Sequence, residues 1–163
     1  MKRLILMRHA KSSWDDPVLA DHDRPLNGRG RLSAKAVGDW LRSCGYIPGQ
    51  AFVSTSTRTR ETFARLKLPC DTEFLEDLYH ATPREILACL RQASGDTVLL
   101  IGHNPGIAEL AQCLPSDKPS HGRFLDFPTC ATLVMDFDVQ DWQAVQTGTA
   151  ASLNFVIPRE LTG

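Results

Sequence analysis

The sequence LILMRHAKS, residues 4–12, carries a run of four apolar residues directly into Arg8 and His9. A secretory signal peptide needs an apolar segment of about 7–15 residues, so this run is too short to be one. It predicts instead a short buried strand whose end presents Arg8 and His9 to a ligand. The rest of the chain indicates what that ligand is.

Two later stretches repeat this arrangement, in which a strand ends close to a basic side chain. AFVSTS (51–56) is followed by Arg58, and DTVLLIG (96–102) is followed by His103. Helices are expected at residues 31–45, 57–66, 82–92 and 106–114, and a terminal hairpin at 131–137 and 142–146. Strands that alternate with helices indicate an α/β sandwich around a mostly parallel sheet. Ligands of such sheets bind where strands end and helices begin, so the basic side chains are expected to converge.

Two of the expected helices carry specific signals. In the helix at 31–45, the apolar residues fall on one stripe, formed by Leu32, Ala36, Val37, Trp40, Leu41 and Cys44. In the helix at 82–92, Thr82 is the expected N-cap, Pro83 fits the first helical position, and Glu85 completes a capping box.

The size and composition of the chain are those of a single soluble domain over residues 1–163. Hydrophobic residues make up 42% of the chain and charged residues 23%, and the net charge of −1 gives no basic field for nucleic acid. No apolar stretch approaches the roughly 18 residues of a membrane span. The five cysteines include no CxxC pair. We therefore expect buried, reduced thiols and a cytoplasmic protein with no membrane or nucleic-acid partner.

Two arginines and two histidines at strand ends suit the binding of a phosphoryl group. Guanidinium forks bind two anionic oxygens at once, which fits Arg8 and Arg58. His103 adds a donor, and the helix that follows it adds the positive end of its dipole. Once the charge is neutralised, a neutral imidazole can attack phosphorus and form a phosphohistidine. His9 is the expected nucleophile, because it lies at the end of the first strand beside Arg8.

Three stretches occur in the order LILMRHAKS (4–12), STSTRTRETF (54–63) and VLLIGHNPG (98–106). They resemble the motifs Arg-His-Gly, Ser-x-x-x-Arg-x-x-x-Thr and Gly-His of the histidine phosphatase superfamily, the phosphoglycerate mutase-like proteins. The resemblance reaches from residue 1 to about residue 137. Ala10 stands where most of the superfamily has glycine. This variant and the short chain are similar to the SixA-like branch, the phosphohistidine phosphatases.

The resemblance implies both a fold and a set of roles. The fold is a three-layer α/β/α sandwich with a mostly parallel central sheet, in a small version without a large inserted cap. The implied site residues are His9 as nucleophile, His103 as second catalytic and phosphate-binding histidine, Arg8 and Arg58 on the phosphate, and Ser54 and Thr62 beside Arg58. The implied activity is metal-independent hydrolysis through a phosphohistidine, without a cofactor. The implied partner is a phosphorylated protein, such as a histidine-phosphorylated signalling domain, or a small phosphorylated substrate.

The general acid is the residue that the sequence specifies least. Larger relatives take it from an inserted helical segment that this chain is too short to hold. Glu76 in FLEDLYHA (74–81) is the candidate, with Asp77 and His80 as alternatives. An imidazole leaving group, whose pKa in free solution is about 6.5, departs more readily than an alkoxide. An uncertain acid therefore favours phosphohistidine as the substrate.

The loop from Lys11 to Gly30 is unusually long for a small α/β domain and borders the proposed pocket. It carries Lys11, Arg24 and Arg29, and Arg31 follows it directly. We expect it to help recognise a phosphorylated protein or an acidic small molecule. A solvated loop held by local aspartate hydrogen bonds is the alternative.

Other functions fit the sequence less well. An Asp136 nucleophile with Asp138 as acid would need a downstream lysine, and none follows Lys118. A cysteine phosphatase would need an arginine six residues after a cysteine, and none is present. Three alternatives stay open. They are a small-molecule phosphomonoesterase of the same superfamily, a non-catalytic phospho-binding module, and a metal site on Asp15, Asp16, Asp21, His22 and Asp23.

Overall fold

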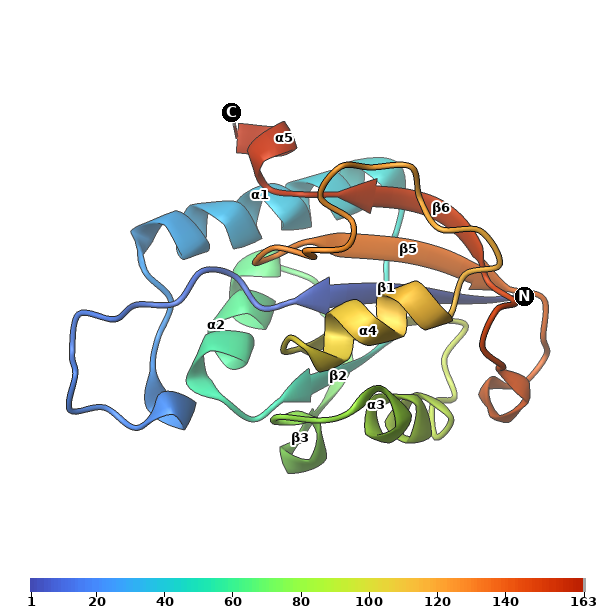
Figure 1. Cartoon of the computed structure of the whole chain (residues 1–163), viewed down its shortest axis with the longest axis horizontal. Helices are drawn as coiled ribbons and strands as arrows, with labels where there is room; N and C mark the ends of the chain where they lie inside the picture. The colour runs from blue at the N-terminus through green and yellow to red at the C-terminus, as the bar shows by residue number, and fades with distance from the viewer. Residues whose placement is uncertain (163) are drawn as a thin grey trace.

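A six-stranded sheet forms the centre of the molecule, of which the computed structural model describes residues 1–162 (Figure 1). The strands are β1 (Lys2–Arg8), β2 (Gln50–Ser54), β3 (Asp71–Leu75), β4 (Thr97–Gly102), β5 (Thr132–Phe137) and β6 (Ala151–Val156). Their order across the sheet is β3-β2-β4-β1-β5-β6, and the first four are parallel. β5 runs antiparallel to both β1 and β6. The mostly parallel sheet that the sequence predicts is confirmed.

Helices cover both faces of the sheet, which gives the three expected layers. On one face lie α1 (Gly28–Cys44), α2 (Thr57–Leu66) and the short α5 (Arg159–Thr162), and on the other lie α3 (Pro83–Leu90) and α4 (Gly106–Cys113). Strand β1 serves both cores, because its successive side chains alternate between the faces. Leu4 and Leu6 pack with α3 and α4, whereas Ile5 and Met7 pack with α1 and α2. The apolar run at the start of the chain is therefore a fully buried central strand.

The register of the parallel strands brings three strand ends together. Arg8 at the end of β1 lies opposite Gly102 at the end of β4. Ile101 of β4 lies opposite Val53, one residue before the end of β2. The residues that follow these strands therefore meet at one edge of the sheet, as the sequence predicts.

The helix boundaries follow from local signals. The capping box at the start of α3 is present, since Thr82 Oγ1 accepts from the Glu85 amide while the Glu85 carboxylate accepts from the Thr82 amide. The prediction of the apolar stripe of α1 is partly wrong, because Leu32 and Cys44 are exposed. The buried face of this helix is formed by Gly30, Ala34, Val37, Gly38 and Leu41. Two glycines on this face let the helix backbone approach its neighbours closely.

The C-terminal hairpin also differs from the prediction. Strand β5 is confirmed, but residues 142–146 form no strand. Trp142 starts a short 3-10 helix, lies buried in the core, and donates its indole N–H to the carbonyl of Gly95. The C-terminal strand that pairs with β5 is instead β6, which the sequence does not predict. Two further short 3-10 helices occur at Asp21–Asp23 and Glu76–Leu78.

The cysteines are free, as expected, but only Cys130 is buried, and Cys44 and Cys113 are exposed. No helix within residues 1–162 has both the length and the apolar character needed to cross a membrane.

Candidate active site

A cavity of about 300 Å³ lies at the edge of the sheet where β1, β2 and β4 end. Arg8, His9, Arg58 and His103 all line it, although they come from three separate parts of the sequence. His80 lines it as well. Among the described residues that line this cavity, hereafter the phosphate pocket, there is no carboxylate. The pocket is therefore suited to an anion.

The backbone of Ala10 fixes the tautomer of His9, and burial keeps its imidazole neutral. Its side chain is almost fully buried, and Nδ1 lies 2.7 Å from the carbonyl oxygen of Ala10. A carbonyl can only accept, so Nδ1 carries the proton and Nε2 carries the lone pair. Burial lowers the pKa of His9 to about 3, and the charges of Arg8 and Arg58 act in the same direction. His9 is thus a neutral imidazole near pH 7.

His103 lies beside His9, with 5.2 Å between the ring centroids. Its Nε2 is 2.8 Å from Ser54 Oγ, and its Nδ1 is 3.5 Å from Nη2 of Arg58. Because a guanidinium only donates, Nδ1 accepts and Nε2 donates to the serine. Burial lowers the pKa of His103 to about 3, and the nearby His9 and Arg58 lower it as well.

Each of the two arginines has a hydrogen-bond donor that no group within residues 1–162 accepts from. Arg58 is 4% exposed and Arg8 is half-buried. The Nε–H groups of these two residues are the buried side-chain polar groups of residues 1–162 that have no hydrogen-bond partner. Burial and the nearby Arg58 lower the pKa of Arg8. Unpaired buried donors are costly to a fold, so this pair points to an anionic ligand.

Asp21 sets the orientation of Arg58, and the sequence did not suggest this role. Arg58 donates from Nη1 to the Asp21 carbonyl at 2.6 Å and from Nη2 to its carboxylate at 3.0 Å. The hydroxyl of Tyr79 donates to the same carboxylate. Together with Arg58, this bond holds the pKa of Asp21 well below its usual range. Asp21 thus acts as the ion-pair partner of Arg58. It is not part of a metal site, because within residues 1–162 no group of three or more His, Cys, Asp or Glu side chains is placed to hold a metal.

Ser54 and Thr62 form buried hydrogen bonds that position the two histidines. Ser54 is fully buried at the end of β2 and accepts from His103. Thr62 is fully buried in α2, accepts from the amide of Ala10 at 2.9 Å and donates to the carbonyl of Arg58 at 2.7 Å. The hydroxyl of Thr62 therefore fixes the backbone that follows His9 relative to α2.

The structure separates the candidate acids. Glu76 is largely exposed, accepts from Thr55 Oγ1 at 2.7 Å, and is not among the residues that line the phosphate pocket. His80 does line it, with 6.2 Å between its ring centroid and that of His103. The φ of His80 is +58°, a conformation that few residues other than glycine adopt. Such strained residues concentrate at functional sites.

The loop between β1 and α1 forms one wall of the pocket. Arg24, a residue of this loop, is buried and donates to Ser12, Ser13 and Asp21. The indole ring of Trp14 lies over the Arg24 guanidinium, 3.5 Å from centroid to Cζ. Arg24 therefore holds the loop in place, and its donors are directed to the loop itself.

The described arrangement can bind a dianionic group and present a nucleophile to it. Two guanidinium groups that share the pocket with two uncharged imidazoles can neutralise anionic oxygens. The Nε2 lone pair of His9 is available for attack on an electrophilic centre held by those groups.

Comparisons with known proteins agree with this geometry. The family model of the histidine phosphatase superfamily (branch 1) matches residues 4–79. The uncharacterized protein Rv1276c of Mycobacterium tuberculosis is 34% identical over 160 residues, which cover 94% of this chain and 100% of that protein. The uncharacterized chloroplastic protein At3g52155 of Arabidopsis thaliana is 32% identical over 158 residues, which cover 87% of this chain and 69% of that protein. A solved structure of a candidate phosphohistidine phosphatase SixA from Nakamurella multipartitia superimposes with a TM-score of 0.84 at 29% identity, over 96% of both chains.

Proposed function

The chain belongs to the histidine phosphatase superfamily, and on this premise we propose that it is a phosphatase that works through a phosphohistidine formed on His9. One observation carries the proposal. Two neutral histidines share a pocket with two arginines, Arg8 and Arg58, whose Nε–H groups have no acceptor among residues 1–162. A phosphoryl group provides acceptors for the arginines and an electrophile for the histidine.

In the first step, the Nε2 lone pair of His9 forms a bond to phosphorus. The bond between phosphorus and the leaving group breaks, and its electron pair stays on the leaving group. Arg8 and Arg58 neutralise the oxygens of the transferred group while the charge redistributes. The hydrogen bond from Nδ1 to the Ala10 carbonyl stabilises the positive charge that His9 acquires.

His103 supports the same step from the other side. A bound phosphoryl dianion raises the pKa of this imidazole, because an adjacent opposite charge favours the protonated form. A protonated His103 donates from Nδ1 to the phosphoryl group, while Nε2 keeps its bond to Ser54.

In the second step, water attacks phosphorus and the bond to Nε2 of His9 breaks. Its electron pair returns to the imidazole, and both protons of the water stay on the released phosphate. For leaving groups that need a proton, we assign the donor role to His80, because it lines the phosphate pocket and the Glu76 carboxylate does not.

We propose phosphohistidine in a protein as the substrate. When the ring nitrogen far from phosphorus is protonated, the leaving imidazole departs as a neutral molecule, and the phosphoryl group passes between two imidazoles of similar basicity. The exposed position of His80 and the absence of a carboxylate from the described pocket lining favour a substrate that needs little acid catalysis. The likeness to the Nakamurella multipartitia protein, a candidate phosphohistidine phosphatase, supports this choice.

Two peptides that differ only in carrying phosphohistidine or phosphoserine test the proposal. We expect kcat/KM to be higher for the phosphohistidine peptide by at least about 10²-fold, the size of an acid-catalysis term. Faster turnover of a phosphoserine peptide or a sugar phosphate would instead favour a small-molecule phosphomonoesterase. Tight binding of phosphopeptide with no turnover, equal for wild type and His9→Asn, would favour a phospho-binding module.

A further inference from the structure

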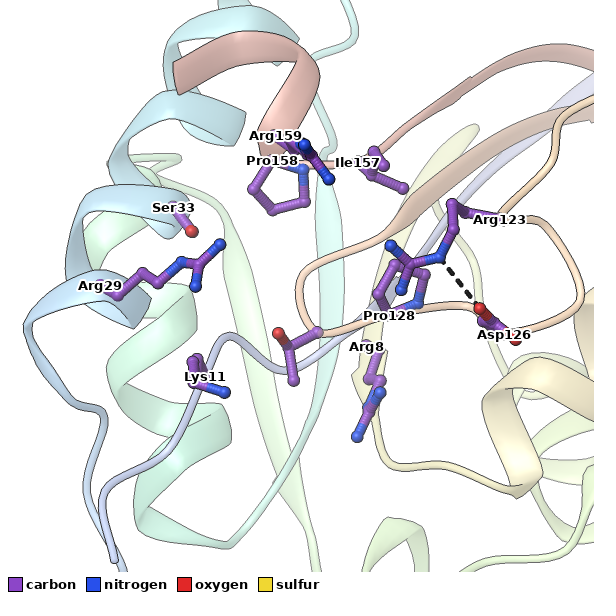
Figure 2. A pocket seen from close by; sticks show the side chains of 11 residues that line it. Arg8, Lys11, Arg29, Ser33, Arg123, Asp126, Pro128, Ile157, Pro158 and Arg159 are labelled. Carbon is purple, nitrogen blue, oxygen red and sulfur yellow. Dashed lines mark hydrogen bonds and ion pairs between the residues drawn. The ribbon is translucent and has the colours of Figure 1, made fainter. Parts of the chain in front are cut away.

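A second, larger cavity of about 460 Å³ adjoins the phosphate pocket (Figure 2). The two share Arg8, Lys11 and Thr129 in their linings, so they are continuous at the end of β1. The mechanism uses only the phosphate pocket. The second cavity, hereafter the cationic trough, is defined by Lys11, Arg29, Arg123 and Arg159, with Arg8 at its junction with the phosphate pocket.

Positive charge is concentrated in the cationic trough although the chain as a whole carries a net charge of −1. Five cationic side chains line it, and Asp126 is the one carboxylate among its described lining residues. That carboxylate already accepts from Arg123 Nε at 2.9 Å. Figure 2 shows Arg29 and Lys11 on one side of the trough and Arg123 on the other, with Arg159 beside Pro158.

Two of these cations, Arg29 and Arg159, gain no stabilising partner among the described residues where they stand. Arg29 lies in the first turn of α1, next to the positive end of the helix dipole, and that turn holds no acidic residue. Neither Arg29 nor Arg159 forms an ion pair with any of residues 1–162. Like charges gathered around one hollow also repel one another. The placement of Arg29 and Arg159, which pair with nothing within residues 1–162, is explained if the trough binds an anionic partner.

Exposed apolar side chains on the loop between β1 and α1 indicate the size of that partner. Trp14 lines the pocket and is 76% exposed, and on the same loop Val18 is 90% exposed and Leu19 is also exposed. A small phosphate ester inside the pocket would leave these three apolar side chains in water. Exposed apolar side chains next to a charged surface are typical of a protein-binding site.

We propose that the cationic trough binds acidic side chains of a phosphorylated protein, next to the residue whose phosphoryl group enters the phosphate pocket. This inference rests on the proposed function and extends it to substrate selection. The carboxylates lie among Arg29, Arg123 and Arg159, and they align the phosphoryl group with Nε2 of His9 through the shared Arg8. Guanidinium groups suit this role, because their planar forks bind carboxylates through two hydrogen bonds.

Two phosphohistidine peptides with the same core, one flanked by aspartates and one by asparagines, test this inference. For the wild type we expect kcat/KM to be about tenfold or more higher for the aspartate peptide at low salt, and the preference to shrink as salt rises. In the double variant Arg29→Ala/Arg159→Ala we expect the preference to disappear. The matched control Arg65→Ala/Arg84→Ala removes the same charge from exposed positions outside both cavities and should keep the preference.

The outcomes separate this inference from the proposed function. Equal turnover of the two peptides by the wild type, or a preference that survives in the double variant, would overturn the inference alone. A small bisphosphate such as a hexose bisphosphate that is turned over faster than either peptide, and only when Arg29 and Arg159 are present, would assign the trough to small molecules instead. If no phosphorylated compound is turned over, the proposed function fails. The affinities of wild type and double variant for the aspartate peptide would then decide whether the trough binds acidic segments.

Discussion

At the scale of single residues, each reactive side chain has a neighbour that fixes its protonation or direction. The carbonyl of Ala10 selects the tautomer of His9, and the guanidinium of Arg58 does the same for His103. Asp21 directs Arg58 through both its carbonyl and its carboxylate. Groups held in this way need little reorganisation when charge moves during a reaction.

The first prediction concerns Arg58. Replacing it with alanine removes a buried cation that faces the phosphoryl group, so kcat/KM for p-nitrophenyl phosphate should fall about 10²–10³-fold, with a higher KM and a lower kcat. Arg58→Lys should recover little, because an ammonium cannot form the planar fork. Arg65→Ala, on the exposed face of the same helix, is the control. A change of less than a few-fold in Arg58→Ala would contradict the assigned role.

The second prediction concerns His80 and depends on the leaving group. His80→Ala should slow hydrolysis of a phosphoserine peptide about 10²-fold, because its alkoxide needs a proton. The same variant should change kcat for p-nitrophenyl phosphate little, because nitrophenolate leaves without one. Glu76→Gln serves as the comparison and should behave like wild type with both substrates. Equal losses for both substrates would argue that His80 positions the phosphoryl group rather than donating a proton.

At the scale of secondary-structure elements, the close approach of α1 to α2 determines how the wall of the pocket is built. A Cβ placed on Gly38 of α1 would overlap the backbone of Leu66 at the end of α2, including its carbonyl oxygen. Helix α2 carries Arg58 and Thr62, and the loop before α1 carries Arg24. The contact at Gly38 therefore sets the distance between two elements that both reach the site.

The third prediction follows from that contact. Alanine is preferred over glycine within a helix by about 1 kcal/mol. At Gly38 this gain is outweighed, because the atoms that a Cβ meets belong to the backbone and cannot rotate away. The free energy of unfolding in urea should therefore fall by about 1–2 kcal/mol in Gly38→Ala. Gly49→Ala, where a Cβ meets nothing within 4 Å, should change it little. Greater stability in Gly38→Ala would contradict the packing.

The sequence predicts best those elements whose signals are local. Strand β1, helix α2 and the capping box of α3 all follow from residues within a few positions of one another. The edge strand β3 was missed, because DTEFL lacks an apolar run. The prediction of a strand at residues 142–146 was wrong, because Trp142 is buried and its indole N–H donates to the carbonyl of Gly95, which is distant in the sequence.

The same division holds for the site. Arg8, His9, Arg58 and His103 were predicted to meet because each lies at the end of a recognisable strand, and the structure brings them into one pocket. The pairing of Asp21 with Arg58 could not be predicted, because it depends on how a long irregular loop folds back over α2. The cationic trough could not be predicted either, because Arg29, Arg123 and Arg159 come from three distant segments of the sequence.

At the scale of the whole molecule, burial of two neutral histidines links the stability of the fold to pH. Both have pKa values of about 3 in the folded protein, against about 6.5 in an unfolded chain. Between these values the unfolded state binds more protons, so stability is lost as pH falls below about 6.5. The folded site therefore costs the molecule stability under acid conditions.

The fourth prediction is a measurement of this linkage. From pH 6.5 to 5, above the range in which carboxylates titrate, the free energy of unfolding should fall with a limiting slope of about 1.4 kcal/mol per pH unit for each histidine. A His9→Gln/His103→Gln variant should show a flatter dependence in urea titrations over the same range. Parallel curves for the two proteins would mean that the histidines are not held neutral.

The central claim is that His9 becomes phosphorylated, and trapping the intermediate tests it most directly. The protein would be mixed with a ³²P-labelled phosphodonor in the presence of a chelator, quenched in alkali, and compared with His9→Ala. A phosphoramidate survives alkali and is lost in acid. We predict alkali-stable, acid-labile label on the wild type and none on the variant. Equal labelling of both proteins, or full phosphatase activity in His9→Ala, would contradict the account.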